Sequence, residues 1–197
     1  NALGSGVSLP GGVDPLVSEI EVAGSNVYVG GHFTEAGGID IGQNIARWDG
    51  NTWHALGTGL GGMIERVVVI GPDVFVGGSF LGTPGDTNTK RIARWDGTSW
   101  NSLGSGLNGV VYDIAEYGSD IYVGGAFTET GNGHPLNHIA RWDGSSWHPV
   151  GSGVNGDVRA IAVAGRKVIL GGDFTDVAGN DSSDHIVGWD GSSWYSL

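Results

Sequence analysis

Residues 121–125 read Ile-Tyr-Val-Gly-Gly, and residues 139–147 read Ile-Ala-Arg-Trp-Asp-Gly-Ser-Ser-Trp. Both segments recur along the chain at a constant spacing of 47 residues. The Gly pairs begin at Gly30, Gly77, Gly124 and Gly171. The Trp-Asp-Gly triplets begin at Trp48, Trp95, Trp142 and Trp189, and a second Trp follows each triplet five residues after the first. A fixed period of this size is the signature of a repeat fold.

Each repeat predicts four short strands. The first is half-alternating, as in residues 17–23, 64–70, 111–117 and 158–164. The second is apolar up to the Gly pair, which is typical of a strand covered on both faces. The third is the Ile-Ala-Arg-Trp segment, and the fourth begins at the second Trp. Between the last two stands Asp-Gly, a hairpin signal because Gly tolerates the positive φ of such turns.

The composition limits both the fold and the partners. Of 197 residues 39 are Gly, while 39% are apolar and 15% charged, which favours a folded, turn-dense β protein over a helical or disordered chain. The net charge of −12 would repel a phosphate backbone, so we exclude nucleic acid as a partner. No apolar run approaches the roughly 18 residues of a membrane span, so we expect no membrane insertion.

A single four-stranded unit cannot bury both of its faces, so neighbouring units must stack. Radial stacking is the arrangement of a β-propeller. We therefore predict an all-β fold, a β-propeller segment of four blades with four antiparallel strands each. The segment spans residues 1–197, with repeats at 1–53, 54–100, 101–147 and 148–197. The chain begins and ends at the same phase of the repeat, which suggests an excerpt of a longer protein.

The order of these markers resembles the kelch repeat of the galactose oxidase central-domain type. The matching features are the apolar run before the Gly pair, an aromatic residue followed by a turn, and then Trp and Leu, here VYVGG, RWDGNTW and HAL. The Gly-rich style is also similar to repeats of large secreted bacterial surface proteins. The resemblance implies a propeller scaffold, but kelch scaffolds serve enzymes, adaptors and adhesive proteins alike.

Most recurring side chains have a structural interpretation. The periodic Trp residues are expected to pack, and the Phe residues that follow each Gly pair (Phe33, Phe80, Phe127 and Phe174) to plug the core. The Asp of each triplet is expected to accept N–H bonds of its own turn. His138 and His185 share one repeat phase with Asn44 and Arg91, which is too little to define a metal site.

The repeats differ most in four twelve-residue loops between the second and third strands, residues 32–43, 79–90, 126–137 and 173–184. Candidate ligand-face residues there are His32, Glu35, Asp40, Glu129 and His134. The fourth loop carries an oxygen-rich set that is a candidate Ca²⁺ site, Asp173, Asp176, Asp181 and Asp184. The alternative is a solvated acidic loop without metal. We assign no other cofactor and no catalytic residue.

We predict a noncatalytic binding or assembly module of a secreted or cell-surface protein, with the long-loop face contacting protein or polysaccharide. An open arc of four blades would expose two apolar faces, so self-association or additional blades are expected. The alternative is a glycan-active enzyme with its site on the long-loop face or in the central channel. The absence of Cys excludes the Cys–Tyr copper chemistry of galactose oxidase.

Overall fold

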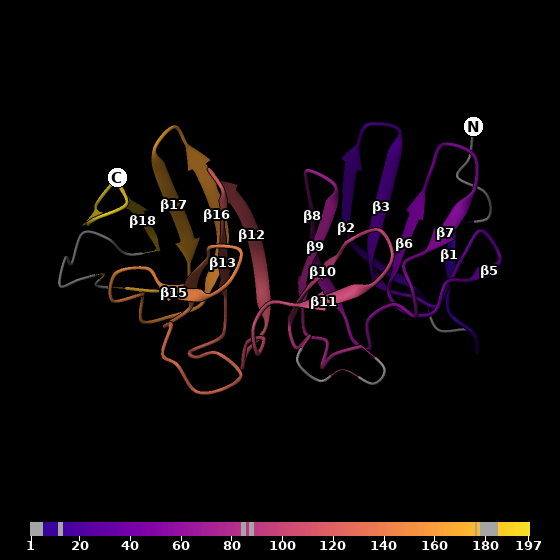
Figure 1. Ribbon diagram of the computed structural model, residues 1–197, viewed down its shortest axis with the longest axis horizontal. Coiled ribbons are helices and arrows are strands. Elements are labelled where there is room, and N and C mark those ends of the chain that lie inside the picture. Colours follow the sequence, from indigo (N-terminus) through magenta and orange to yellow (C-terminus); the bar gives the residue numbers. More distant parts are fainter. Residues whose placement is uncertain (1–5, 12–13, 84–85, 87–88, 176, 178–184) are drawn as a thin grey trace. The chain divides into compact units, whose positions relative to one another are not determined.

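The computed structural model describes residues 6–11, 14–83, 86, 89–175, 177 and 185–197. Every regular element in these ranges is a strand, and the strands form antiparallel sheets (Figure 1). Within these ranges there is no helix long and apolar enough to cross a membrane. The all-β prediction is therefore confirmed for the described chain.

Each repeat forms one four-stranded sheet whose strands follow one another in chain order. Sheet 1 consists of β2 (Leu16–Ala23), β3 (Asn26–His32), β6 (Ile45–Trp48) and β7 (Trp53–Ala55). Sheet 2 consists of β8 (Ile64–Ile70), β9 (Asp73–Gly78), β10 (Ile92–Trp95) and β11 (Trp100–Ser102).

Sheets 3 and 4 repeat the same plan. Sheet 3 consists of β12 (Val111–Tyr117), β13 (Asp120–Gly125), β14 (Ile139–Trp142) and β15 (Trp147–Pro149). Sheet 4 consists of β16 (Val158–Ala164), β17 (Lys167–Gly172), β18 (Ile186–Trp189) and β19 (Trp194–Tyr195). The predicted meander of four strands per repeat is confirmed in all four copies.

A small fifth sheet was not expected from the repeat. It joins β1 (Val7–Ser8), β4 (Glu35–Ala36) and β5 (Ile39–Asp40) in the order β1-β4-β5. Its last two strands lie inside the first long loop, whereas β1 lies at the start of a six-residue insertion that only the first repeat carries. In the third repeat the matching residues Leu107 and Thr130 form a single bridge, so the β1–β4 pair extends a contact that this repeat also makes.

The first strand of every sheet carries a bulge opposite the Gly pair. The register shifts between Val17 and Glu19 in sheet 1, and at the same repeat phase in the other three sheets. A Cβ on Gly31 would collide with the Leu16 carbonyl oxygen, so only Gly fits opposite this bulge. A bulge bends the strand and increases its local twist.

The chain divides into two compact units, residues 1–102 with sheets 1 and 2, and residues 103–197 with sheets 3 and 4. In the first unit Ile45 of sheet 1 and Ile64 and Val67 of sheet 2 share one fully buried cluster. In the second unit Ile139 of sheet 3 and Val158 of sheet 4 share another. Within each unit the two sheets therefore pack face to face, as expected for units that cannot bury their faces alone.

Candidate functional site

The base of each long loop is closed by one residue in the left-handed region. Its N–H donates to the carbonyl of the core Phe, and its carbonyl accepts from the second Gly of the pair; for His138 these bonds measure 2.8 Å to Phe127 and 3.0 Å from Gly125. The four residues, with φ between 62° and 68°, are Asn44, Arg91, His138 and His185. We call them the latch residues. Their common repeat phase reflects this backbone role.

Latch side chains turn back toward the backbone. Asn44 accepts from the Phe33 N–H at 3.1 Å and donates to the Leu60 carbonyl at 2.7 Å. Nδ1 of His138 and of His185 lies 3.2 and 3.0 Å from the carbonyl oxygens of Gly125 and Gly172. Each plugging Phe is completely buried, so the loops stand on a fixed base. The prediction that these Phe side chains fill the core is confirmed.

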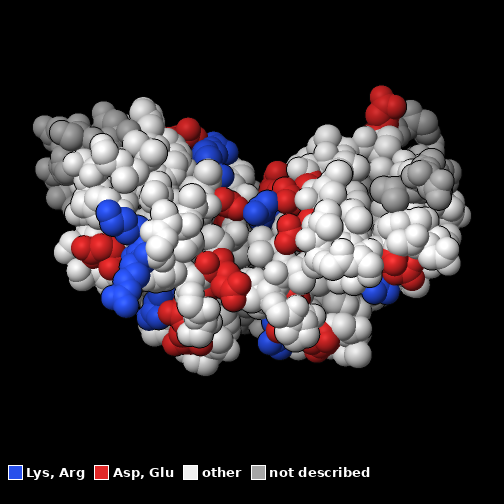
Figure 2. Space-filling view, turned by 90° about the horizontal axis from the view of Figure 1, so that it is seen from above, with Lys and Arg blue, Asp and Glu red and all other residues white. Residues whose placement is uncertain are grey.

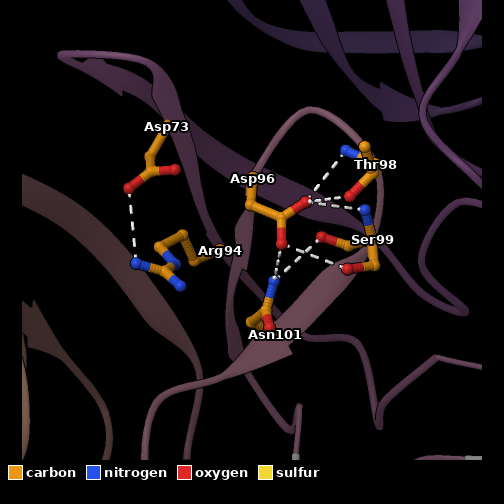
Figure 3. Close-up of polar contacts among 6 residues, drawn as sticks. All are labelled: Asp73, Arg94, Asp96, Thr98, Ser99 and Asn101. Atoms are coloured by element: carbon orange, nitrogen blue, oxygen red, sulfur yellow. Dashed lines mark hydrogen bonds and ion pairs between the residues drawn. The ribbon is translucent and has the colours of Figure 1, made fainter.

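The Asp of each Trp-Asp-Gly triplet organises its turn. Asp96 Oδ1 accepts from the N–H groups of Thr98 and Ser99 at 2.9 and 2.8 Å, and Asn101 donates to its other oxygen (Figure 3). These donors hold the Asp96 pKa far below its usual range, with the Ser99 N–H as the largest cause. The carboxylates are thus committed to turn structure, as the sequence predicted.

The eight Trp form four cross-strand pairs within the sheets, with ring centroids 4.9–5.5 Å apart. Trp100 and Trp147 each donate an indole N–H to the backbone of the link before their sheet, to Leu56 at 2.9 Å and Leu103 at 2.8 Å. The predicted packing role is confirmed, and these bonds also fix the links between repeats.

The first long loop contains three of the predicted ligand-face candidates, His32, Glu35 and Asp40. Glu35 accepts from the Ser8 hydroxyl at 2.6 Å and lies opposite Asp40 in the β4–β5 pair. Asp40 accepts from the Gly42 N–H at 2.9 Å. His32 ends β3 and is exposed. Glu35 and Asp40 are thus brought together across one small hairpin.

The candidate Ca²⁺ set lies mostly outside the described residues, since only Asp173 belongs to them. Its carboxylate binds the Arg159 guanidinium, with Nη2 at 2.7 Å and Nε at 2.9 Å. Arg159 also lies 3.2 Å from Asp157 and stacks over the Tyr112 ring at 4.3 Å. No cluster of three metal-ligating side chains occurs in the described part of the chain. The Ca²⁺ site stays a prediction.

An open groove of about 520 Å³ lies along the outer strand of sheet 3. One wall is the third long loop, with Thr130, Asn132 and His134, and the other is the Asp143 turn with Ser145 and Ser146. Trp142 and Trp147 line it between these walls. Aromatic rings with hydroxyl, amide and imidazole groups around them fit a neutral, polar ligand with an apolar face.

Polar contacts hold the long-loop wall of the groove in place. The Thr130 hydroxyl donates to Asn132 Oδ1 at 2.6 Å and accepts from the His134 N–H at 3.0 Å. The Asn132 amide oxygen also accepts from Ser105 of the preceding link at 3.1 Å. The wall is therefore preorganised, while the exposed His134 ring projects from a fixed backbone.

Sequence reasoning found only part of this groove. His134 lines it, whereas Glu129 is held beside the Asn108 side chain, whose Oδ1 accepts from the Glu129 N–H at 3.1 Å. Asn132 and the two Ser of the Asp143 turn were not singled out. These residues come from a loop and a turn that are separate in sequence, so no local pattern marked them as neighbours.

Charge does not single out one binding patch. Figure 2 shows acidic side chains spread over both units rather than gathered in one place. Several are paired, as in Arg66 with Glu19 at 2.6 Å and Arg94 with Asp73 at 3.4 Å. The groove of sheet 3 is lined by uncharged side chains and His134, which separates it from these ion pairs.

Comparisons with known proteins add information on the fold. No family model matches the chain, and no curated protein matches it. Among solved structures the chain is similar to the computationally designed Ika4 protein, with a TM-score of 0.53 and 13% identity over 96% of this chain and 97% of that one. The computationally designed Ika8 protein has a TM-score of 0.43 and 15% identity, over 93% and 61% of the two chains. At these identities the likeness concerns the fold alone.

Proposed function

We propose that the chain is a noncatalytic binding module of a secreted or cell-surface protein, in which four kelch-like blades belong to a β-propeller. Face-to-face packing of the two four-stranded sheets within each unit, with long loops clamped at one end of each sheet, supports this architecture. A propeller scaffold presents such loops together on one face. The secreted location rests on the Gly-rich, weakly charged composition alone.

The groove of sheet 3 carries the binding proposal. A neutral oligosaccharide has apolar ring faces and a rim of hydroxyl groups. The groove offers the matching parts, Trp142 and Trp147 together with Asn132, His134 and the turn serines. Its volume is in the range of small-molecule sites. A neutral ligand also avoids repulsion by a chain of net charge −12.

Titration calorimetry with neutral hexasaccharides tests the proposal, using cellohexaose, xylohexaose and mannohexaose as probes. We expect one of them to bind and the double variant Asn132→Ala/His134→Ala to weaken binding roughly fivefold, the worth of about one hydrogen bond. Glu116→Ala is the matched control, because Glu116 is exposed on sheet 3 and does not line the groove. The proposal would be contradicted if none of the probes bound, or if the groove double variant bound as tightly as the Glu116→Ala control.

The same samples separate the module from the alternative, a glycan-active enzyme. After incubation with each hexasaccharide, reducing ends are measured against a blank. We expect no release above the blank. Release of reducing ends that disappears in the groove variant would instead assign the groove to hydrolysis and reject the noncatalytic function.

A further inference from the structure

The two sheet-to-sheet junctions inside the units are built on one rule. The first Gly of each pair leaves room for two β-branched side chains from the first strand of the next sheet. A Cβ on Gly30 would lie 2.6 Å from Ile64 and 2.9 Å from Val67. A Cβ on Gly124 would in the same way meet Val158 and, at 3.2 Å, Ile161. Each junction therefore has a glycine hollow on one sheet and an apolar knob on the next.

The knob of sheet 1 has no hollow to fill. Val17 and Ile20 stand at the repeat positions of Ile64 and Val67, which are fully buried. In sheet 1 they are 39% and 59% exposed, and Val22 and Leu16 beside them are 64% and 46% exposed. Burying such aliphatic side chains away from water favours association. The first strand of sheet 1 therefore exposes several apolar side chains rather than one.

The hollow of sheet 4 has no knob. At Gly171 the one described atom that an added Cβ would meet is the His185 carbonyl oxygen, at 3.8 Å. Ile186 stands at the repeat position of Ile45 and Ile139. Those two are completely buried at their junctions, yet Ile186 is 48% exposed. Sheet 4 thus presents the same receiving surface that sheets 1 and 3 use, and this surface is open.

The hairpins that carry the open knob and the open hollow differ in composition. The hairpin of β2 and β3, residues 16–32, contains Glu19 and Glu21 and no Lys or Arg. The hairpin of β16 and β17, residues 158–172, contains Arg159, Arg166 and Lys167 and no acid. Glu19 is paired with Arg66 of sheet 2, and Arg159 is paired with Asp157 and Asp173, so these charges are engaged within the chain and docking rests on the apolar fit.

We infer that sheet 4 of one copy of this chain docks on sheet 1 of a second copy, seating Val17 and Ile20 of one in the Gly171 hollow of the other. The contact continues the junction already present twice in the chain. Such head-to-tail contacts either close into a ring or run on as a fibre. Propellers typically hold four to eight blades, so two copies with eight sheets is the closed assembly that fits.

Light scattering coupled to size exclusion tests the inference on the whole chain. We expect twice the mass of one chain at micromolar concentration. Gly171→Leu fills the open hollow at a position where an added Cβ makes only an ordinary contact with the described residues, so it should keep the circular dichroism spectrum and give single chains. Ile20→Ser should weaken dimerisation roughly tenfold, and Leu81→Ser, at an exposed apolar residue outside this face, should leave it unchanged.

Cysteine pairing identifies the partner surface, because the chain contains no other Cys. Ile20→Cys and Gly171→Cys are purified separately, mixed and oxidised. We expect a disulfide-linked dimer in the mixture and not in either variant alone. Single chains in light scattering would overturn the inference. So would a variant carrying both Ile20→Cys and Gly171→Cys in one chain, if its disulfide formed only within that chain. Neither result depends on oligosaccharide binding, so the groove proposal stands or fails separately.

Discussion

Sheets 3 and 4 share one topology and one unit but differ in how their outer strands satisfy polar groups. In sheet 3 Arg141 pairs with Asp120 at 2.5 Å and His148 with Asp143 at 2.6 Å. In sheet 4 the matching positions hold Gly188, Lys167 and Tyr195, and Lys167 lies over the Tyr195 ring at 4.8 Å. The strands form in both, so these ion pairs adjust stability without defining the fold.

Replacing the ion pairs of sheet 3 leaves buried polar atoms unpaired in sheet 4. Among the described residues, Trp194 Nε1 and Tyr195 OH are buried without a hydrogen-bond partner, whereas the matching Trp147 Nε1 donates to Leu103. Tyr195 occupies the space that a side chain at position 188 would need. Aromatic packing thus replaces a pair of charges, and three changes in one repeat depend on one another.

The largest effect on stability is expected from a substitution that disturbs the packing of Tyr195 on Gly188. Gly188→Val forces the Tyr195 ring out of its place and should lower the free energy of unfolding by about 2 kcal/mol, the usual range for overpacking. Adding Tyr195→Ser, which removes the obstructing ring, should recover about half of that loss. Urea unfolding monitored by Trp fluorescence measures both. If the double variant is no more stable than Gly188→Val, Tyr195 is not the obstacle.

A smaller difference is expected between the two second Trp residues. Trp147→Phe loses ring area and leaves the Leu103 carbonyl without its donor, while Trp194→Phe loses the ring area and removes a buried unpaired N–H. Trp147→Phe should therefore be more destabilising than Trp194→Phe by about 1 kcal/mol, the net value of one hydrogen bond. Thermal unfolding of the two variants compares them directly, and equal losses would contradict this account.

The smallest effect concerns acid. The pKa of Asp143 lies below its ordinary value of 3.8, first because of the bond to His148 and then because of the Ser145 and Ser146 N–H groups. A carboxyl whose pKa is lowered on folding adds stability above the ordinary value, and this is lost as the pH falls through the folded value. Asp143→Asn should flatten the stability profile below about pH 4.

Asp190 serves as the control for this measurement, because its pKa is lowered by Ser193 and Ser192 without a His partner. Asp190→Asn should flatten the profile less than Asp143→Asn. Urea midpoints between pH 7 and pH 2.5 give both profiles. Identical profiles for the two variants would show that the His148 bond adds nothing to acid stability.

The strand plan could be predicted from sequence because the markers that set it are local. The Gly pair, the Asp-Gly turn and the two Trp fix where each strand begins and ends, and their recurrence identifies them four times over. The Gly30 and Gly124 hollows were not predicted, since they depend on a side chain 34 or more residues away. Likewise the groove joins a loop and a turn that are neighbours only after the sheet has formed.

The latch position shows where sequence similarity misleads. His138 and His185 share a phase, and an observer counting ligands would group them. In the structure this repeat position has a backbone role, because Asn, Arg and His are all held there at positive φ by the same two backbone hydrogen bonds. Nothing in a single sequence marks this conformation, because Gly, its usual occupant, is absent from all four copies.

Each latch residue fixes the base of its long loop through backbone hydrogen bonds, which do not depend on the side chains of the loop. Both of its backbone bonds lie at the root of the loop, so the exposed residues between them can be exchanged, provided that buried ones such as Ala36 and Ile41, which pack against sheet 1, are kept. Loops taken from one repeat could thus be grafted onto another, or randomised in a library, while the four-stranded sheet below keeps its structure. The chain is in this sense a display scaffold with four addressable positions.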